Sequence, residues 1–245
     1  MSVLIVTGTG TDVGKTVTTA ALAACAQAQA QAQARTPGSV AVVKLAQTGV
    51  RPGAPGDLAE VTRLSGITEV HEFARYPDPL SPHHAAQVSG RPELEQGDAV
   101  MRVLDLESRH DLVVIEGAGG LLVPFTSSDR WTLVDLASSL RAGVVVVVAA
   151  GLGTINHTAL TVERLAEDRI ELRGIVIGSW PTRPDLATRC NVSDLAAMAP
   201  DGALAGVLPA GMATVRDFRK QARAALAPRW GGTFDWPAFQ AAVRP

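Results

Sequence analysis

The sequence predicts an α/β domain built on a mostly parallel sheet with helices on both faces. Short β-branched runs alternate with helix-like segments along the chain, and these runs are apolar almost throughout rather than at every second residue. Strands of that kind are buried on both faces, which is typical of parallel sheets covered by helices. The predicted strands are residues 3–6, 40–43, 112–115, 144–148, 172–177 and 205–208.

Seven helices are predicted between and after these strands. They cover residues 15–34, 58–64, 93–108, 133–140, 155–167, 189–198 and 213–226. The first includes an alternating Ala/Gln tract at 26–34, and both residue types form helices readily, so we interpret the tract as a solvated extension of that helix. Because no segment has the length and composition of a linker, we expect a single domain over residues 1–245, with two small domains as the weaker alternative.

Composition excludes several classes of partner. The chain has 245 residues, with 22 Lys and Arg against 24 Asp and Glu, a formal charge of -2. That balance offers no overall attraction to nucleic acid or to an anionic membrane, and the few aromatics (Phe 5, Trp 4, Tyr 1) make a base-stacking surface improbable. The longest apolar stretch, 144–150, is far shorter than the ~20 residues that span a bilayer.

Cysteine usage indicates a reducing compartment. Cys25 and Cys190 are isolated, and the N-terminus lacks the basic and apolar segments of a signal peptide. We therefore expect a cytoplasmic protein.

A phosphate-binding loop follows the first strand and opens the first helix. Residues 8–16 read GTGTDVGKT. Glycines in this context let backbone N–H groups and a helix N-terminus face an anion, which predicts a P-loop NTPase-like domain. Lys15 would contact the outer phosphates and Thr16 would bind Mg²⁺. Thr9 occupies the position of the usual first glycine, which indicates a subfamily of P-loop proteins.

Two carboxylates are candidate metal ligands. Glu116 follows the run 111–115, at the carboxyl end of a buried strand where open α/β sheets collect their ligands. Asp57 follows a Pro/Gly-rich loop at 51–56, and Mg²⁺ prefers oxygen ligands. By position Asp57 could equally cap a helix, and the two roles can coexist.

Two further segments could bind anions. Lys44 ends the predicted strand 40–43, where its ammonium could stabilise a phosphate or an acidic substrate. Residues 151–157, GLGTINH, follow another strand and precede another helix. This segment could offer free N–H groups to a carboxylate, or it could be a simple glycine turn.

Four motifs together resemble the dethiobiotin synthetase family. They are TGTGTDVGKT, KLAQTG, VVIEGAGGLLVP and GLGTINHTALT, in that order and spacing, and the similarity extends from Met1 to about Gly211. The resemblance implies an ATP-dependent carboxylase of biotin biosynthesis that joins 7,8-diaminopelargonic acid and CO₂ with the help of Mg²⁺. It also implies a homodimer in which the helix starting at 153–156 receives the substrate carboxylate from the neighbouring subunit.

The resemblance also implies roles for individual residues. Catalytic roles fall on Lys44, Lys15 and Thr11; Mg²⁺ ligands are Thr16, Asp57 and Glu116; and substrate contacts are Thr48, Gly153, Thr154, Ile155 and Asn156. The implied nucleotide-binding residues are Asp12, Val13, Gly14, Lys15, Thr16, Val17, Asp57, Glu116, Gly117, Ala118, Gly119, Gly178, Ser179, Pro209, Ala210 and Gly211.

The sequence departs from the family pattern at two positions. Leu45 follows Lys44 where many relatives have proline, which removes a restriction on the backbone. Gly178 stands where many relatives have an asparagine that contacts adenine. Glycine has no side-chain amide, so we hypothesise a relaxed preference for the base or even a preference for pyrimidine triphosphates.

A different class of function is a partner-switching P-loop ATPase of the partitioning type. Such proteins usually carry an additional lysine early in the loop, and residues 8–13 contain none. An amidotransferase-type relative would need a glutaminase domain, for which the sequence leaves no room.

Overall fold

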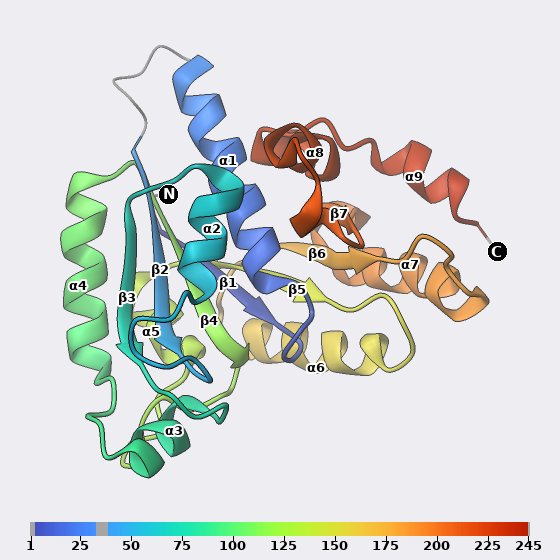
Figure 1. The fold of residues 1–245 in the computed structure, drawn as a ribbon. Helices are drawn as coiled ribbons and strands as arrows, with labels where there is room; N and C mark the ends of the chain where they lie inside the picture. The colour runs from blue at the N-terminus through green and yellow to red at the C-terminus, as the bar shows by residue number, and fades with distance from the viewer. Residues whose placement is uncertain (1–2, 33–38, 245) are drawn as a thin grey trace.

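The strands form one parallel sheet. The computed structural model describes residues 3–32 and 39–244, and in that part of the chain seven strands pair in the order β3-β2-β4-β1-β5-β6-β7 (Figure 1). Every adjacent pair is parallel, which confirms the predicted sheet. The strands are β1 (Val3–Gly8), β2 (Val40–Gln47), β3 (Val70–Arg75), β4 (Leu112–Gly120), β5 (Gly143–Val148), β6 (Leu172–Trp180) and β7 (Gly206–Pro209).

Helices cover both faces of the sheet (Figure 1). They are α1 (Lys15–Ala32), α2 (Asp57–Ser65), α3 (Pro82–Ser89), α4 (Gln96–Arg109), α5 (Leu133–Leu140), α6 (Thr154–Glu167), α7 (Leu186–Met198), α8 (Phe218–Ala225) and α9 (Trp236–Ala242). Helices α1, α2 and α8 pack together on one face, while α4 packs against α5 and α6 against α7 on the other.

Successive residues of the central strands point alternately into two hydrophobic cores, one on each face of the sheet. Val42 and Val114 point into the core beneath α1, α2 and α8, whereas Val43 and Ile115 point into the core on the opposite face. All four side chains are fully buried. Burial on both faces is the physical reason that these strands are continuously apolar in the sequence.

Most strands continue beyond their predicted ends, and for β2 the expectation that Lys44 ends the strand was wrong. Strand β2 runs on to Gln47 because it pairs with β3 through Ala46 and Gln47. Strand β4 likewise runs on to Gly120. Lys44 and Glu116 are therefore register partners inside adjacent strands.

The sequence prediction missed β3, α3 and α9. Strand β3, VHEFAR, is a half-buried edge strand that lacks a continuous apolar run. Helices α3 and α9 are short and start with proline in the first turn. The predicted helix 213–226 was partly wrong: a 3₁₀ turn at Met212–Thr214 comes first, and α8 begins only after Asp217, whose side chain accepts a hydrogen bond from the Lys220 N–H.

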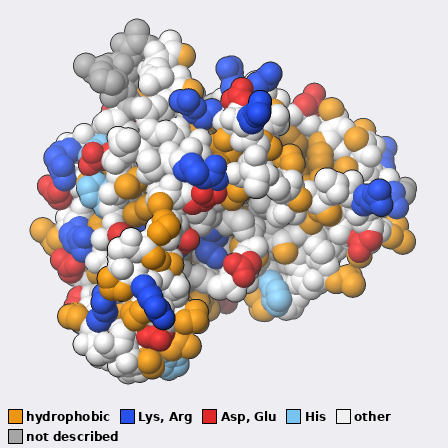
Figure 2. Space-filling model, in the orientation of Figure 1, with side chains coloured by type: hydrophobic (Ala, Val, Ile, Leu, Met, Phe, Trp, Pro, Cys, Tyr) orange, Lys and Arg blue, Asp and Glu red, His pale blue; other side chains and the backbone are white. Residues whose placement is uncertain are grey.

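The Ala/Gln tract is helical as far as Ala32, and residues 33–34 lie outside the described residues. No helix in the described ranges is long and apolar enough to cross a membrane. Basic and acidic side chains are interspersed over the face shown in Figure 2.

Candidate active site

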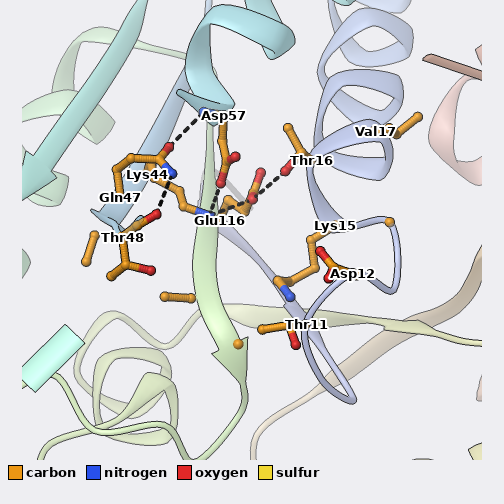
Figure 3. A pocket seen from close by; sticks show the side chains of 14 residues that line it. Thr11, Asp12, Lys15, Thr16, Val17, Lys44, Gln47, Thr48, Asp57 and Glu116 are labelled. Atoms are coloured by element: carbon orange, nitrogen blue, oxygen red, sulfur yellow. Dashed lines mark hydrogen bonds and ion pairs between the residues drawn. The ribbon is translucent and has the colours of Figure 1, made fainter. Parts of the chain in front are cut away.

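A cavity of about 410 Å³ lies at the carboxyl edge of the sheet, between the phosphate-binding loop, β2, β4 and the start of α2 (Figure 3). It is lined by Thr11, Asp12, Gly14, Lys15, Thr16, Val17, Lys44, Ala46, Gln47, Thr48, Asp57, Glu116, Ala118 and Gly119. Parallel strands end at a common edge, which is why residues far apart in the sequence meet here.

The loop between β1 and α1 is shaped to surround an anion. Asp12 has φ 58° and Gly14 has φ 96°, so the backbone turns through the left-handed region before α1 begins at Lys15. The Lys15 ammonium donates a hydrogen bond to the Gly10 carbonyl at 2.6 Å. Burial lowers the pKa of Lys15, and Lys44 nearby lowers it further. A bound anion would stabilise the charged ammonium of Lys15 and raise its pKa again.

Gly178 supports this loop from β6. A Cβ at position 178 would lie 2.0 Å from the Val13 carbonyl oxygen and 2.6 Å from Val147 Cγ1. Only glycine therefore allows the loop to rest against β6, which gives a packing reason for the missing side chain. Ser179 is exposed beyond it, as are Pro209 at the end of β7 and Ala210 and Gly211 after it; none of these four residues lines the cavity.

Lys44 is the centre of a buried ionic cluster. Its ammonium lies 2.7 Å from Glu116 Oε1 and 2.6 Å from Asp57 Oδ2, and it donates to the Gly117 carbonyl at 3.1 Å. Lys44 is 4% exposed and Glu116 1%. Burial by itself would lower the pKa of Lys44, but the charges of Glu116 and Asp57 outweigh it and raise the pKa above its usual value.

Glu116 has one oxygen in use and one without a partner. The Thr16 hydroxyl donates to Glu116 Oε1 at 2.9 Å, while the buried Oε2 has no hydrogen-bond partner. A buried acceptor of this kind normally has a partner, so the orphaned oxygen fits a site that binds a cation or a donor group.

Thr16, Asp57 and Glu116 are the residues that could hold a divalent cation. Two carboxylates and a hydroxyl suit Mg²⁺, which binds oxygen ligands and usually keeps several waters. In the part of the chain that the structure describes, no three His, Cys, Asp or Glu side chains form a metal site by themselves. Phosphate oxygens and water would therefore complete the coordination.

The structure brings together only part of the predicted substrate site. Thr48 lines the cavity, but Gly153, Thr154, Ile155 and Asn156 do not. Thr154 is buried and its hydroxyl donates to the Ala149 carbonyl at 2.7 Å. Gly153 has φ 88° and precedes α6 as its N-cap, between the exposed Leu152 and the buried Thr154.

Sequence reasoning missed Gln47 as a residue of the site. It is 4% exposed, lines the cavity, and accepts a hydrogen bond from the Asp57 N–H at 2.7 Å. Its position in the segment KLAQTG was a usable signal, because a polar residue that continues a buried strand needs a partner.

The chain is similar over its whole length to a set of curated proteins. It is 52% identical over 243 residues to the ATP-dependent dethiobiotin synthetase BioD of Frankia casuarinae, covering 98% of both chains. It is 57% identical over 211 residues to the protein of that name from Rhodococcus jostii, covering 86% of this chain and 87% of that one. The chain belongs to the dethiobiotin synthetase family. A family model described as an AAA domain matches residues 2–214.

Two solved structures share the fold of this chain. The MinC:MinD cell division protein complex of Aquifex aeolicus aligns with a TM-score of 0.53 and 12% identity, covering 90% of this chain and 86% of that one. A ParA family ATPase from Chlorobium tepidum aligns with a TM-score of 0.50 and 12% identity, covering 92% and 90%. At such low identity the likeness concerns the fold and not the activity.

We predict that Lys44→Met lowers the free energy of unfolding by about 3 kcal/mol, because it leaves the buried Glu116 carboxylate uncompensated. Urea denaturation at pH 7 measures the change. Since the pKa of Lys44 is raised, its contribution should persist at mildly alkaline pH and be lost only as the pH rises through that pKa. Lys220→Met, on the exposed face of α8, is the control. Equal stability of the two variants would show that the ionic cluster around Lys44 does not stabilise the fold.

Proposed function

We propose that the protein makes dethiobiotin from 7,8-diaminopelargonic acid, CO₂ and a nucleoside triphosphate. The observation that carries this proposal is the single cavity in which the phosphate-binding loop, the Lys44 cluster and Thr48 meet. Membership of the dethiobiotin synthetase family supports the same substrates, because the relatives are named ATP-dependent dethiobiotin synthetases.

The reaction consists of three bond-forming steps. One amine of the substrate adds to CO₂ and loses a proton, giving a carbamate. A carbamate oxygen attacks the γ-phosphorus, the bond to the β-phosphate oxygen breaks, and a carbamic-phosphoric anhydride forms. The second amine then attacks the anhydride carbon, loses a proton and expels phosphate, which closes the cyclic urea.

Anion stabilisation is the main task of the residues around the cavity. Lys15 and Lys44 face this space with their ammonium groups, and each would offset charge on the carbamate and on the transferred phosphoryl group. Thr11, at the loop side of the cavity, would donate a hydroxyl hydrogen bond to the same reactants. Thr48 would bind the diamine from the β2 side.

Thr16, Asp57 and Glu116 would hold Mg²⁺. The unpartnered Glu116 Oε2 and the Thr16 hydroxyl beside it support this assignment. The ion would screen charge on the β- and γ-phosphates during transfer. The residues around the phosphates would be Asp12, Val13, Gly14, Val17, Gly117, Ala118 and Gly119, with Gly178, Ser179, Pro209, Ala210 and Gly211 toward the base.

We infer that the protein discriminates only weakly between nucleotide bases. Gly178 supports the loop through its backbone and offers no side-chain amide, and Ser179 after it is exposed. Contacts of this kind do not distinguish an adenine from a pyrimidine by paired hydrogen bonds.

We infer a homodimer in which α6 completes the substrate site of the neighbouring subunit. Leu152, Ile155 and Leu160 are exposed around the start of α6, at 86%, 38% and 59%. Leu160 also lines a shallow hollow together with Thr9 and Leu122, so this side of α6 adjoins the phosphate-binding loop. A second copy would cover these exposed apolar side chains and bring its own Gly153–Asn156 N–H groups near a substrate carboxylate.

We also infer that residues 1–245 act as one domain and that the protein works in a reducing cytoplasm. All the described strands join a single sheet, and both cysteines are free thiols, Cys25 buried and Cys190 exposed. Surface thiols without partners suit a reducing compartment.

The proposed function predicts dethiobiotin from diaminopelargonate, ¹³C-bicarbonate, Mg²⁺ and nucleotide, with one labelled carbon detected by mass spectrometry. Lys44→Met should lower kcat/KM at least about a hundredfold, since it removes a charge that stabilises the transition state, while Lys220→Met should not.

The weak discrimination between bases predicts that ATP, CTP, GTP and UTP support rates within about tenfold of one another. No product from the native protein, or full activity of Lys44→Met, would refute the mechanism; a strong ATP preference would refute only the weak reading of the base.

The dimer proposal predicts that Leu160→Glu dissociates the protein, because a charge would be buried in an apolar interface. Light scattering coupled to size-exclusion chromatography should give the mass of one chain for this variant and of two for the native protein. Met101→Glu changes an exposed apolar residue on α4, at 66% exposure, and should remain dimeric. A native monomer, or a dimeric Leu160→Glu, would contradict the interface.

A further inference from the structure

The first turn of α2 is capped from another strand. Gly56 is the N-cap residue and has no side chain that could accept a hydrogen bond, although four N–H groups at a helix start need partners. The side chain of Gln47, at the end of β2, supplies the acceptor: its Oε1 lies 2.7 Å from the Asp57 nitrogen (Figure 3). The strand that carries Lys44 thus also binds the backbone of Asp57.

Gly56 provides the space for this contact. A Cβ at position 56 would lie 2.5 Å from Gln47 Oε1 and 2.9 Å from its Cδ. The backbone of Gly56 has φ -112°, which any residue adopts, so the requirement for glycine here is one of room rather than of conformation. Any larger residue would push the Gln47 amide away from Asp57.

The loop before Asp57 is anchored from the edge strand. Arg75 on β3 is the register partner of Gln47, and its Nη1 donates to the carbonyls of Ala54 at 2.7 Å and Arg51 at 3.2 Å. The rest of its guanidinium binds both oxygens of Glu72, at 2.6 and 2.7 Å. The loop is thus held near its middle by Arg75 and at its end by Gln47.

Asp57 is the member of the ionic cluster that most needs such support. Its side chain is 33% exposed, whereas those of Lys44 and Glu116 are 5% and 1%. Glu116 is fixed inside a central strand, but Asp57 stands at the first residue of a helix that follows a loop. A hydrogen bond to its own backbone N–H limits where its carboxylate can go.

We propose that Gln47 is a positioning residue that holds the Asp57 carboxylate where it binds Lys44 and the metal–nucleotide complex. The proposal rests on the proposed function only in giving Asp57 a metal-binding role. Residues that orient metal ligands through hydrogen bonds typically change metal affinity by 10- to 100-fold when they are replaced. Gln47 should therefore act on the metal–nucleotide complex and not on the diamine.

Three variants separate this role from a general loss of structure. Gln47→Met keeps the length of the side chain but removes both the acceptor and the amide that donates to the Thr48 carbonyl at 3.3 Å. Gln47→Glu also lacks that donor but keeps an oxygen that can accept from the Asp57 N–H, so it separates the two contacts. Gly56→Ala leaves Gln47 intact but displaces its amide. Gln87→Met removes an exposed amide on α3, which donates to the Ser127 hydroxyl, and serves as the control.

The test is Mn²⁺ binding in the presence of a non-hydrolysable nucleotide and without diamine, followed by electron paramagnetic resonance, together with steady-state kinetics. We expect Gln47→Met and Gly56→Ala to weaken Mn²⁺ binding about tenfold and to raise the KM for the metal–nucleotide complex by a similar factor, with the KM for diamine unchanged. Gln47→Glu should restore Mn²⁺ binding to within about threefold of native, and Gln87→Met should match the native protein.

Native Mn²⁺ affinity in Gln47→Met would overturn the proposal, and so would a defect confined to the KM for diamine, which would make Gln47 a substrate contact. Should Gln47→Met not fold, Gly56→Ala decides between these results. If the native protein binds Mn²⁺ and nucleotide but forms no dethiobiotin, the proposed function fails while the role of Gln47 stands.

Discussion

The site depends on one buried cation held between two carboxylates. Lys44 lies within 2.7 Å of Glu116 and 2.6 Å of Asp57, in a place almost closed to water. Removing ions from water costs several kcal/mol each, and such a cluster is stable only when opposite charges are held in close contact. The neighbouring elements meet this requirement: β2 and β4 place Lys44 opposite Glu116, and α2 brings Asp57 over both.

The same constraint connects the cluster to phosphate chemistry. Two carboxylates and one ammonium leave a net negative charge beside the phosphate-binding loop, where Lys15 contributes a second ammonium. Opposite charges held in a fixed arrangement need little reorganisation when a charged reactant enters, which is the main source of electrostatic catalysis. The parallel sheet makes this possible because its strand ends converge on one edge.

The sequence was sufficient for the elements whose signals are local or repeated. Continuous apolar runs predicted the central strands, and GTGTDVGKT predicted the loop before α1, because glycine and lysine at that spacing have few other uses. It failed at β3, whose pattern VHEFAR reflects an edge position that depends on its neighbours. Gln47 and Gly56 were missed because their importance arises from a contact between a strand end and a helix start. The polar Gln47 in KLAQTG signals that it needs a partner, but the sequence does not say which group that partner is.

The measurement that tests the central claim most directly is a double-mutant cycle on the unfolding free energy, with Lys44→Met, Glu116→Gln and the double variant in metal-free buffer. Contacting charges in one network show interaction energies of about 0.5–3 kcal/mol. We predict that the double variant is more stable than the sum of the single changes by more than about 1 kcal/mol, because removing both charges leaves neither one buried alone. Additive effects would show that Lys44 and Glu116 do not stabilise each other.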